Sequence, residues 1–230
     1  MIKRVLAVAA HPDDEVLGCG GTLARHAQRG DEVHILVLAD GVSARGSDQS
    51  DIERRRQAAT VSSQVLGAHS LMLESLPDNR MDSRDLLDVI QVVEKVVDEM
   101  TPHIVYTHHH GDLNVDHRIA HDATLTACRP TGGHCVELLA AFEVLSSSEW
   151  ATPSSGTAFL PNFFVDIADT FDLKLKALNC YADEMRAFPH PRSIRAVTAL
   201  AELRGSTIGA AKAEAFAIVR QIDAGAARNE

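Results

Sequence analysis

Apolar residues along this chain fall into short unbroken runs that alternate with longer segments of helical periodicity. An unbroken apolar run bounded by polar residues indicates a strand buried on both faces, as in a parallel sheet. The pattern predicts strands at residues 5–10, 32–38, 70–73 and 103–107, with further strand-like segments at 136–145 and 163–167.

Helices are predicted where apolar residues recur every three or four positions. The clearest case is the segment 85–100, which a Thr-Pro pair follows and ends. The remaining predicted helices, the first two of them closed by a glycine, lie at residues 22–29, 51–66, 116–128, 172–181 and 207–223.

The alternation of strand and helix predicts an α/β protein with a doubly wound, mostly parallel sheet and helices on both faces. It extends over roughly the first 130 residues. We expect a single domain over residues 1–230, with the core at about 4–130 and a C-terminal part at about 131–225 that shapes the substrate site.

Composition narrows the classes of partner. A formal net charge of −10 disfavours binding to nucleic-acid phosphates, and an aromatic content of 4% disfavours stacking on single strands. We expect no membrane span, and four cysteines without C-x-x-C spacing indicate reduced thiols in a cytoplasmic protein. The 12 histidines favour metal or acid–base chemistry.

Polar clusters follow two of the predicted strands. Residues 11–15 (HPDDE) come after the first strand, and residues 108–117 (HHHGDLNVDH) come after the strand at 103–107. Because open α/β sheets place their sites at the carboxyl ends of strands, we expect the two clusters to face one another.

The two clusters contain the groups that zinc catalysis requires. Three nitrogen or oxygen ligands and an open position for water are needed, and His11, Asp14 and His117 supply such a set. Asp13 would then be a free carboxylate beside the metal and a candidate base. His121, four residues after His117 on a predicted helix, is a rival ligand. The alternative for the first cluster is a solvated acidic turn in which Asp13 caps the following helix. In the second cluster, His108, His109 and His110 cannot all point inward, so we expect most of this triplet to be solvated or bonded to backbone.

Two motifs carry a resemblance to a known family. Residues 10–15 (AHPDDE) resemble the signature of the LmbE-like (PIG-L-type) zinc-dependent N-acetylglucosaminyl deacetylases, and residues 114–117 (NVDH) resemble its second motif, commonly His-x-Asp-His. The resemblance runs from residue 4 to about 220, with weaker support from residues 76–80, 146–150, 190–193 and 204–205.

The resemblance implies a Rossmann-like fold and removal of an N-acetyl group from an N-acetylglucosamine-type conjugate. Attack by zinc-bound water is implied, with His11, Asp14 and His117 as zinc ligands and Asp13 as the general base. Ferrous iron (Fe2+) is the alternative metal, because two histidines and one carboxylate also suit it. The implied partner is a small N-acetylated amino sugar, and a homo-oligomer through the apolar loop 158–164 stays open.

One departure from the family pattern concerns the second motif. Asn114 occupies the position of its first histidine, and asparagine donates a hydrogen bond but cannot become a cationic acid. In the family, this histidine supplies an acid or a partner for the oxyanion. Either Asn114 is a neutral hydrogen-bond donor to the oxyanion, or His190 in its proline-bounded loop takes the place of the missing histidine. Asp116 is expected to orient a neighbouring group through its carboxylate.

Other residues suggest contacts with substrate. The family places an arginine in the helix that carries Arg54–Arg56, and spacing favours Arg55 as a binder of phosphate or carboxylate. The alternative is that this triplet is a solvated helix face. Asp78 is a candidate acceptor for a sugar hydroxyl, or a turn residue.

Two further functions stay open besides the deacetylase. The first is a non-catalytic metal or glycan-binding module of the same fold, for which Asn114 is the sequence hint. The second is nucleotide binding through Gly18, Gly20 and Gly21, which resemble a phosphate-cradling loop but lack the G-x-G-x-x-G spacing directly after the strand.

Overall fold

A seven-stranded sheet forms the centre of the protein in our computed structural model, which describes residues 2–46, 48–131 and 135–223. The strand order is β3-β2-β1-β4-β5-β7-β6, and the pairs among the first five strands are all parallel. β7 is antiparallel to both of its neighbours. The strands are β1 (Arg4–Ala9), β2 (Glu32–Ala39), β3 (Ser70–Leu76), β4 (Ile104–His108), β5 (Leu138–Phe142), β6 (Phe163–Asp166) and β7 (Ala213–Gln221).

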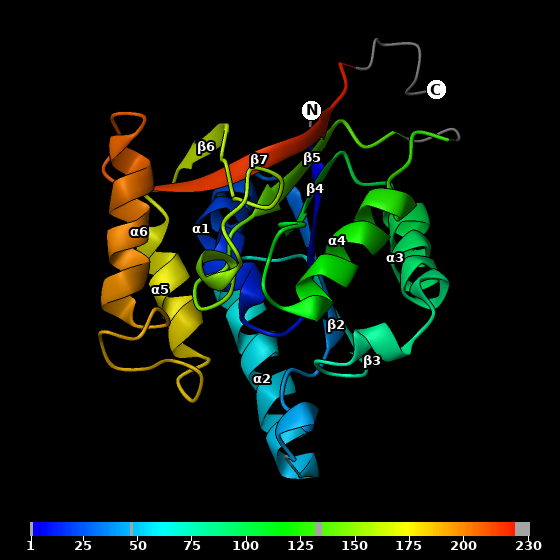
Figure 1. Cartoon of the computed structure of the whole chain (residues 1–230). Coiled ribbons are helices and arrows are strands. Elements are labelled where there is room, and N and C mark those ends of the chain that lie inside the picture. Colours follow the sequence, from blue (N-terminus) through cyan, green and yellow to red (C-terminus); the bar gives the residue numbers. More distant parts are fainter. Residues whose placement is uncertain (1, 47, 132–134, 224–230) are drawn as a thin grey trace.

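Helices cover both faces of this sheet (Figure 1). Side chains of α1, α2, α5 and α6 belong to one hydrophobic cluster, and those of α3 and α4 belong to a second one on the opposite face. The doubly wound, mostly parallel α/β prediction is therefore confirmed. The helices are α1 (Asp14–Gln28), α2 (Gln49–Val65), α3 (Leu86–Met100), α4 (Val115–Ala127), α5 (Phe171–Asn179) and α6 (Ile194–Ser206).

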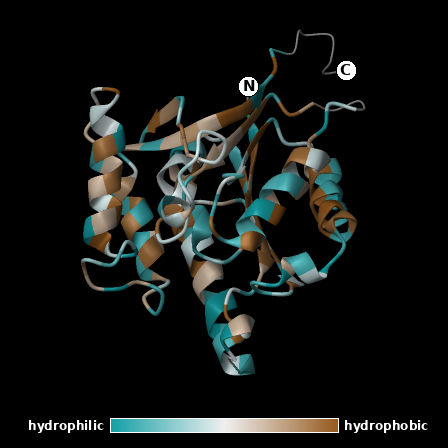
Figure 2. Ribbon diagram, viewed as in Figure 1, coloured by the Kyte–Doolittle hydropathy of each residue, from teal (hydrophilic) through white to brown (hydrophobic). Residues whose placement is uncertain are grey.

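The first turns of α2 project from the body of the molecule and are mostly hydrophilic (Figure 2). Asp48 caps this helix, since its side chain accepts hydrogen bonds from the amides of Ser50 and Asp51. Within the described residues, no helix is both long and apolar enough to cross a membrane.

Two features of the C-terminal part differ from the sequence prediction. Residues 207–223 are not a helix: Ala213–Gln221 form β7, which pairs with β5 on one side and β6 on the other. The helix in this region is α6, which the pattern did not indicate. Alanine-rich sequence favours a helix in isolation, but two strand partners and a buried position override that preference.

The glycines after the HPDDE turn do not form a phosphate-cradling loop. Gly18, Gly20 and Gly21 lie inside α1, which begins at Asp14 instead of residue 22. They allow close packing: a Cβ on Gly18 would overlap the Phe142 ring, and one on Gly21 would lie 2.8 Å from Ile167.

A kink divides α1 after its first turns. Cys19 has non-helical angles (φ −143°, ψ 17°), which frees backbone groups on both sides of it. The Glu214 carboxylate accepts from the amides of Gly21 (2.9 Å) and Thr22 (2.7 Å). Lys174 Nζ donates to the Leu17 carbonyl (2.8 Å) and to Glu214 Oε1 (2.5 Å). This buried ion pair stabilises the break, so the first turns of α1 keep a direction of their own.

Candidate functional site

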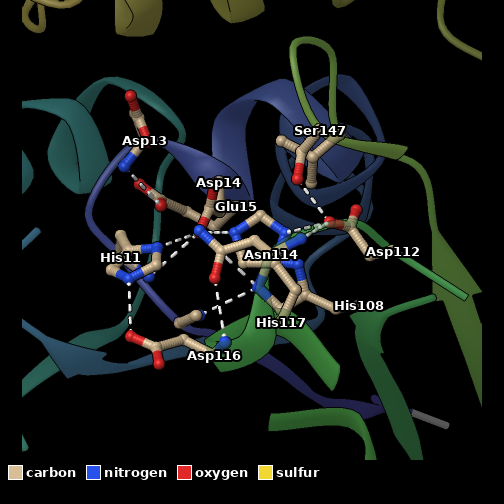
Figure 3. Close-up of polar contacts among 12 residues, drawn as sticks. His11, Asp13, Asp14, Glu15, His108, Asp112, Asn114, Asp116, His117 and Ser147 are labelled. Atoms are coloured by element: carbon tan, nitrogen blue, oxygen red, sulfur yellow. Dashed lines mark hydrogen bonds and ion pairs between the residues drawn. The ribbon is translucent and has the colours of Figure 1, made fainter. Parts of the chain in front are cut away.

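The two polar clusters meet at the carboxyl ends of β1 and β4 (Figure 3). The turn after β1 supplies His11, Asp13 and Asp14, and the loop after β4 leads through Asp112 into α4 with His117 in its first turn. The neighbouring parallel strands end side by side, so residues about 100 positions apart in sequence become neighbours.

His11, Asp14 and His117 form a buried group that could hold a metal ion. Asp14 Oδ2 lies 3.2 Å from His11 Nδ1 and 3.2 Å from His117 Nε2. One ligand atom from each residue falls within 4.8 Å of the others. Asp14 Oδ1 and His117 Nε2 are buried without a hydrogen-bond partner, which is costly unless a bound ligand completes them. The donor set therefore fits a divalent metal such as zinc.

Charges within this group stabilise one another. Burial alone lowers the pKa of His117, but the charges of Asp14 and Asp112 raise it to about 9. Burial raises the pKa of Asp14, yet the facing His117 and His11 hold it well below its usual value. Asp14 is therefore an ionised carboxylate at neutral pH, as a ligand must be, whereas a metal bound at His117 would have to replace the proton that the raised pKa of His117 retains.

A carboxylate lies behind each imidazole. His11 Nε2 donates to Asp116 Oδ2 at 3.0 Å, with Asp78 Oδ1 at 3.3 Å, so its Nδ1 is directed at Asp14. Asp116 in turn accepts from the backbone amides of Asn79 (2.6 Å) and Met81 (3.0 Å). Asp116 therefore lies behind His11, where its carboxylate could orient the imidazole, and the orienting role stays a prediction. His11, Asp78 and Asp116 form a second group that could hold a metal, sharing His11 with the first.

Asp112 does the same for His117, and sequence reasoning missed it. Its Oδ1 lies 3.1 Å from His117 Nδ1, which leaves Nε2 to face Asp14. The hydroxyls of Ser147 and Ser148 (2.5 Å) also donate to its carboxylate. Burial alone raises the pKa of Asp112, but His117 and the two serines lower it to about 2. The sequence signals that could have indicated Asp112 are its place in the HGDLNVDH segment and the serines at 146–148. Only the fold shows that these two segments are in contact.

The histidine triplet is bonded to the backbone. His108 Nε2 accepts from the Ala10 amide at 2.8 Å, while its ring stacks 4.0 Å from that of His117. His109 and His110 contact the carbonyls of residues 157 and 156. The rival ligand His121 contacts the His108 carbonyl through Nδ1 (2.8 Å) and belongs to neither candidate metal group of the described residues.

Asp13 lies buried beside the metal group in a strained conformation, with φ at 109°. Its Oδ2 is 2.9 Å from Arg192 Nη1 and 3.1 Å from Arg55 Nη2, whereas Oδ1 has no hydrogen-bond partner. Burial raises the pKa of Asp13 although both guanidinium groups act to lower it. One carboxylate oxygen is therefore fixed and the other is free to exchange a proton.

The predicted substrate binders are engaged inside the protein. Besides Asp13, Arg55 pairs with Glu184 (Nη1–Oε1, 3.2 Å) and donates to the Pro12 carbonyl (2.5 Å). Asp78 is buried, close to His11, and accepts from the Ala44 amide (3.0 Å). Arg192, whose sequence signal is limited to its place in the weakly matching segment 190–193, completes the arrangement: its Nε donates to Ser146 Oγ at 2.7 Å.

The two candidates for the missing histidine differ in their surroundings. Asn114 is the N-cap of α4, where Oδ1 accepts from the Asp116 amide (2.8 Å) and Nδ2 donates to Asn79 Oδ1 (3.0 Å). His190 Nδ1 accepts from the Arg192 amide at 3.0 Å. In a neutral ring the proton then resides on Nε2.

Taken together, fold and site define an α/β domain with a candidate metal centre at the ends of its parallel strands. The chain belongs to the PIG-L (LmbE-like) family, because the GlcNAc-PI de-N-acetylase family model matches residues 6–128. An uncharacterized deacetylase of Escherichia coli, YaiS, is 32% identical over 76% of this chain and 89% of its own length. The sequence-based family assignment is thereby confirmed.

Other relatives show how the family varies. The diacetylchitobiose deacetylase of Thermococcus kodakarensis is 27% identical over 80% of this chain and 70% of its own length. The 4-oxalmesaconate hydratase of Pseudomonas putida is 27% identical over 79% and 74%. The crystal structure of the conserved protein TT1542 from Thermus thermophilus superimposes with a TM-score of 0.77 at 26% identity, covering 98% of both chains. The family therefore includes both deacetylases and hydratases.

Proposed function

We propose that this protein is a metal-dependent deacetylase that removes the N-acetyl group from an N-acetylglucosamine-type sugar conjugate. The observation that carries the proposal is the His11–Asp14–His117 group with the half-free carboxylate of Asp13 next to it. A bound zinc ion would polarise the acetamide carbonyl and activate a water molecule.

Asp13 is the general base and then the general acid in this proposal. Its unpartnered Oδ1 takes the proton of the attacking water, and the same oxygen returns it to the departing amine. Arg192 and Arg55 hold Oδ2, so the carboxylate cannot turn away. The raised pKa of Asp13 makes it a better proton acceptor than an exposed aspartate.

His190 is the more suitable donor to the oxyanion. The Asn114 side chain is held as the cap of α4 by its Oδ1 and bonded to Asn79 through one of its two Nδ2–H groups, so a single N–H of a fixed amide is left. The Nε2–H of a neutral His190 carries the free proton, since its Nδ1 accepts from the Arg192 amide. We assign Arg55 to Asp13 and Asp78 to His11, as residues that position those groups.

An acetate-release screen tests the proposal. The protein is assayed with N-acetylglucosamine, diacetylchitobiose and N-acetylglucosaminyl inositol, with and without a chelator, and then with zinc or ferrous iron added back. We expect acetate from at least one sugar, loss with chelator and recovery with one metal. Bound metal without acetate from any sugar would instead support a binding module.

A hydratase is the second candidate. Arg45, Arg55 and Arg192 surround Glu184 at 3.0 to 3.5 Å, and two of these guanidinium groups, those of Arg55 and Arg192, also contact Asp13. Such groups suit a carboxylate-rich substrate, as the name of the hydratase relative implies for that protein. Loss of ultraviolet absorbance from an unsaturated carboxylic acid, without acetate release from sugars, would favour this function.

A further inference from the structure

Each of three loops that carry site residues also exposes one large apolar side chain. The first loop holds Asp112, the second holds Ser147, and the third holds His190. Large side chains exposed next to a polar site are more informative than single ones elsewhere on a surface. The three side chains are Leu113, Trp150 and Phe188.

Among these, Trp150 offers the open flat face. The Arg195 guanidinium lies 4.1 Å from the centre of the Phe188 ring and covers one of its faces, and Leu113 has no planar surface. Trp150 is 53% exposed, and its described ring contact is the His190 ring, nearly perpendicular at 6.3 Å and 82°. A perpendicular neighbour leaves much of the indole uncovered.

Short chains of contacts fix Trp150 relative to both halves of the site. It ends the 3-10 helix η3 (Ser148–Trp150), whose Ser148 hydroxyl donates to Asp112, the partner of His117. The Glu149 carboxylate accepts from the amides of Ser146 (2.6 Å) and Ser147 (3.1 Å), which holds this turn in shape.

The other half of the site is reached through the same turn. Ser146 Oγ accepts from Arg192, and Arg192 pairs with Asp13. An exposed indole on a mobile loop would be ordinary, whereas this indole is attached to a turn that both the metal group and the proposed base hold in place.

We propose that Trp150 is a specificity-determining residue whose indole face packs against the C–H face of the substrate's pyranose ring. The inference rests on the proposed deacetylase function and names the ring that the enzyme recognises. One face of a pyranose presents C–H groups, which the electron-rich face of an indole attracts. Packing of this kind orients the sugar without using any of the carboxylates near the metal group.

The proposal separates the substrate classes. An open-chain acetamide has no such face, and a polycarboxylate would be recognised by guanidinium groups instead of an indole. A sugar conjugate should therefore depend on Trp150, while a minimal acetamide such as N-acetylethanolamine should not.

Tryptophan fluorescence reads this contact directly, because Trp150 is the single tryptophan of the chain. The full-length protein is titrated with glucosamine, diacetylchitobiose and N-acetylethanolamine. We expect a saturable change in emission with the two sugars and none with N-acetylethanolamine. An emission that no sugar changes would overturn the proposal.

Kinetics supply the second readout. Trp150→Ala should raise KM for the sugar about five- to tenfold with kcat changed less than about twofold, and Trp150→Phe should recover most of the loss. Leu203→Ala removes an equally exposed apolar side chain from the end of α6 and should leave both constants unchanged. An unchanged KM in Trp150→Ala would contradict the assignment.

The two proposals fail in different ways. If the wild-type protein releases no acetate from any N-acetyl sugar, the deacetylase function is wrong, while a saturable fluorescence change with sugar still supports Trp150 as the sugar contact. A second outcome is that acetate is released, the tryptophan emission does not change with sugar, and the KM does not change in Trp150→Ala. Trp150 is then not the sugar contact, and the deacetylase function stands.

Discussion

Several polar atoms of single residues at this site are buried without hydrogen bonds. They include Asp14 Oδ1, Asp13 Oδ1 and His117 Nε2, which face the proposed reaction, and also His108 Nδ1 and Arg55 Nε, which lie behind it. Leaving such atoms unpaired costs about 1–3 kcal/mol each in a folded protein. For Asp14 Oδ1 and His117 Nε2, which belong to the candidate metal group, a bound cation would offset this cost.

Replacement of the proposed base is the first prediction. Asp13→Asn keeps the size of the side chain but removes the proton acceptor, so turnover should fall about 10²- to 10⁴-fold while the metal content stays the same. Acetate release and elemental analysis measure the two quantities. Asp82→Asn, at an exposed position, is the control. An Asp13→Asn protein with normal turnover would remove Asp13 from the mechanism.

The second prediction concerns the carboxylate behind His117. Asp112→Asn should weaken metal binding about 10- to 100-fold, because the imidazole loses the charge that orients it. Competition with a fluorescent chelator measures the affinity. Asp122→Asn changes an exposed aspartate of the neighbouring helix α4 and should leave it unaltered. Equal affinities for the two variants would show that Asp112 serves only to fix Ser147 and Ser148.

How far the sequence predicts these residues depends on their separation. His11, Asp13 and Asp14 lie in one strand–turn–helix unit, so local pattern was sufficient to place them. The prediction that His117 faces them needed only the rule for neighbouring parallel strands. Arg192 reaches Asp13 from 179 positions away, and no local signal indicates that contact.

At the level of elements, α1 brings a candidate metal ligand into the site and also packs tightly against the sheet. Its first turns carry Asp14, and the glycines that follow press against β5 and the segment after β6. The kink at Cys19 separates these two tasks, and the Lys174–Glu214 pair stabilises it. Helix geometry here is set by tertiary contacts more than by local propensity.

A glycine substitution tests this packing. Gly18→Ala would push a methyl group into the Phe142 ring, and we expect it to lower the free energy of unfolding by about 1–3 kcal/mol. Gly20→Ala is the matched control in the same helix: its nearest neighbour would be a Val16 methyl at 3.0 Å, so the change should stay within about 1 kcal/mol. Urea denaturation followed by circular dichroism measures both. Equal stabilities would mean that α1 can shift away from β5.

The same elements show why one sequence prediction was wrong. The segment that forms β7 is rich in alanine, and its strand character comes from lying between β5 and β6. Pattern within the segment carries no information about such partners, whereas the strand at 5–10 is apolar throughout and was recognised correctly.

For the molecule as a whole, the buried acidic residues are concentrated at the candidate site. Of the acidic residues buried in the described part of the chain, all but one belong to the site or its arginine partners: Asp13, Asp14, Glu15, Asp78, Asp112, Asp116 and Glu184, with Glu214 at the α1 kink as the exception. A divalent cation would offset part of this negative charge, so folding and metal binding should be linked.

The melting temperature should therefore depend on metal. Zinc at about 100 times its dissociation constant stabilises the folded state by about 2.7 kcal/mol, which corresponds to about 5–10 °C for a domain of this size. Differential scanning calorimetry of chelator-treated and zinc-loaded protein measures the shift. In His117→Ala the shift should disappear, and a shift that persists there would place the metal elsewhere.

The insertion of β7 between β5 and β6 also has a consequence for the order of assembly. Glu214 on β7 bonds to Gly21, 193 positions earlier in the chain. During synthesis, β1 to β5 emerge first and have all their parallel partners. The side of β5 (Leu138–Phe142) that faces away from β4 stays unpaired until β7 is made, about 70 residues later. Until then it is an open edge of the kind that recruits other chains. Productive folding of this protein therefore requires that β5 pair with β7 before it pairs with a strand of another chain. The α1 kink becomes fixed only after β7 has joined the sheet, because Glu214 of β7 bonds to it.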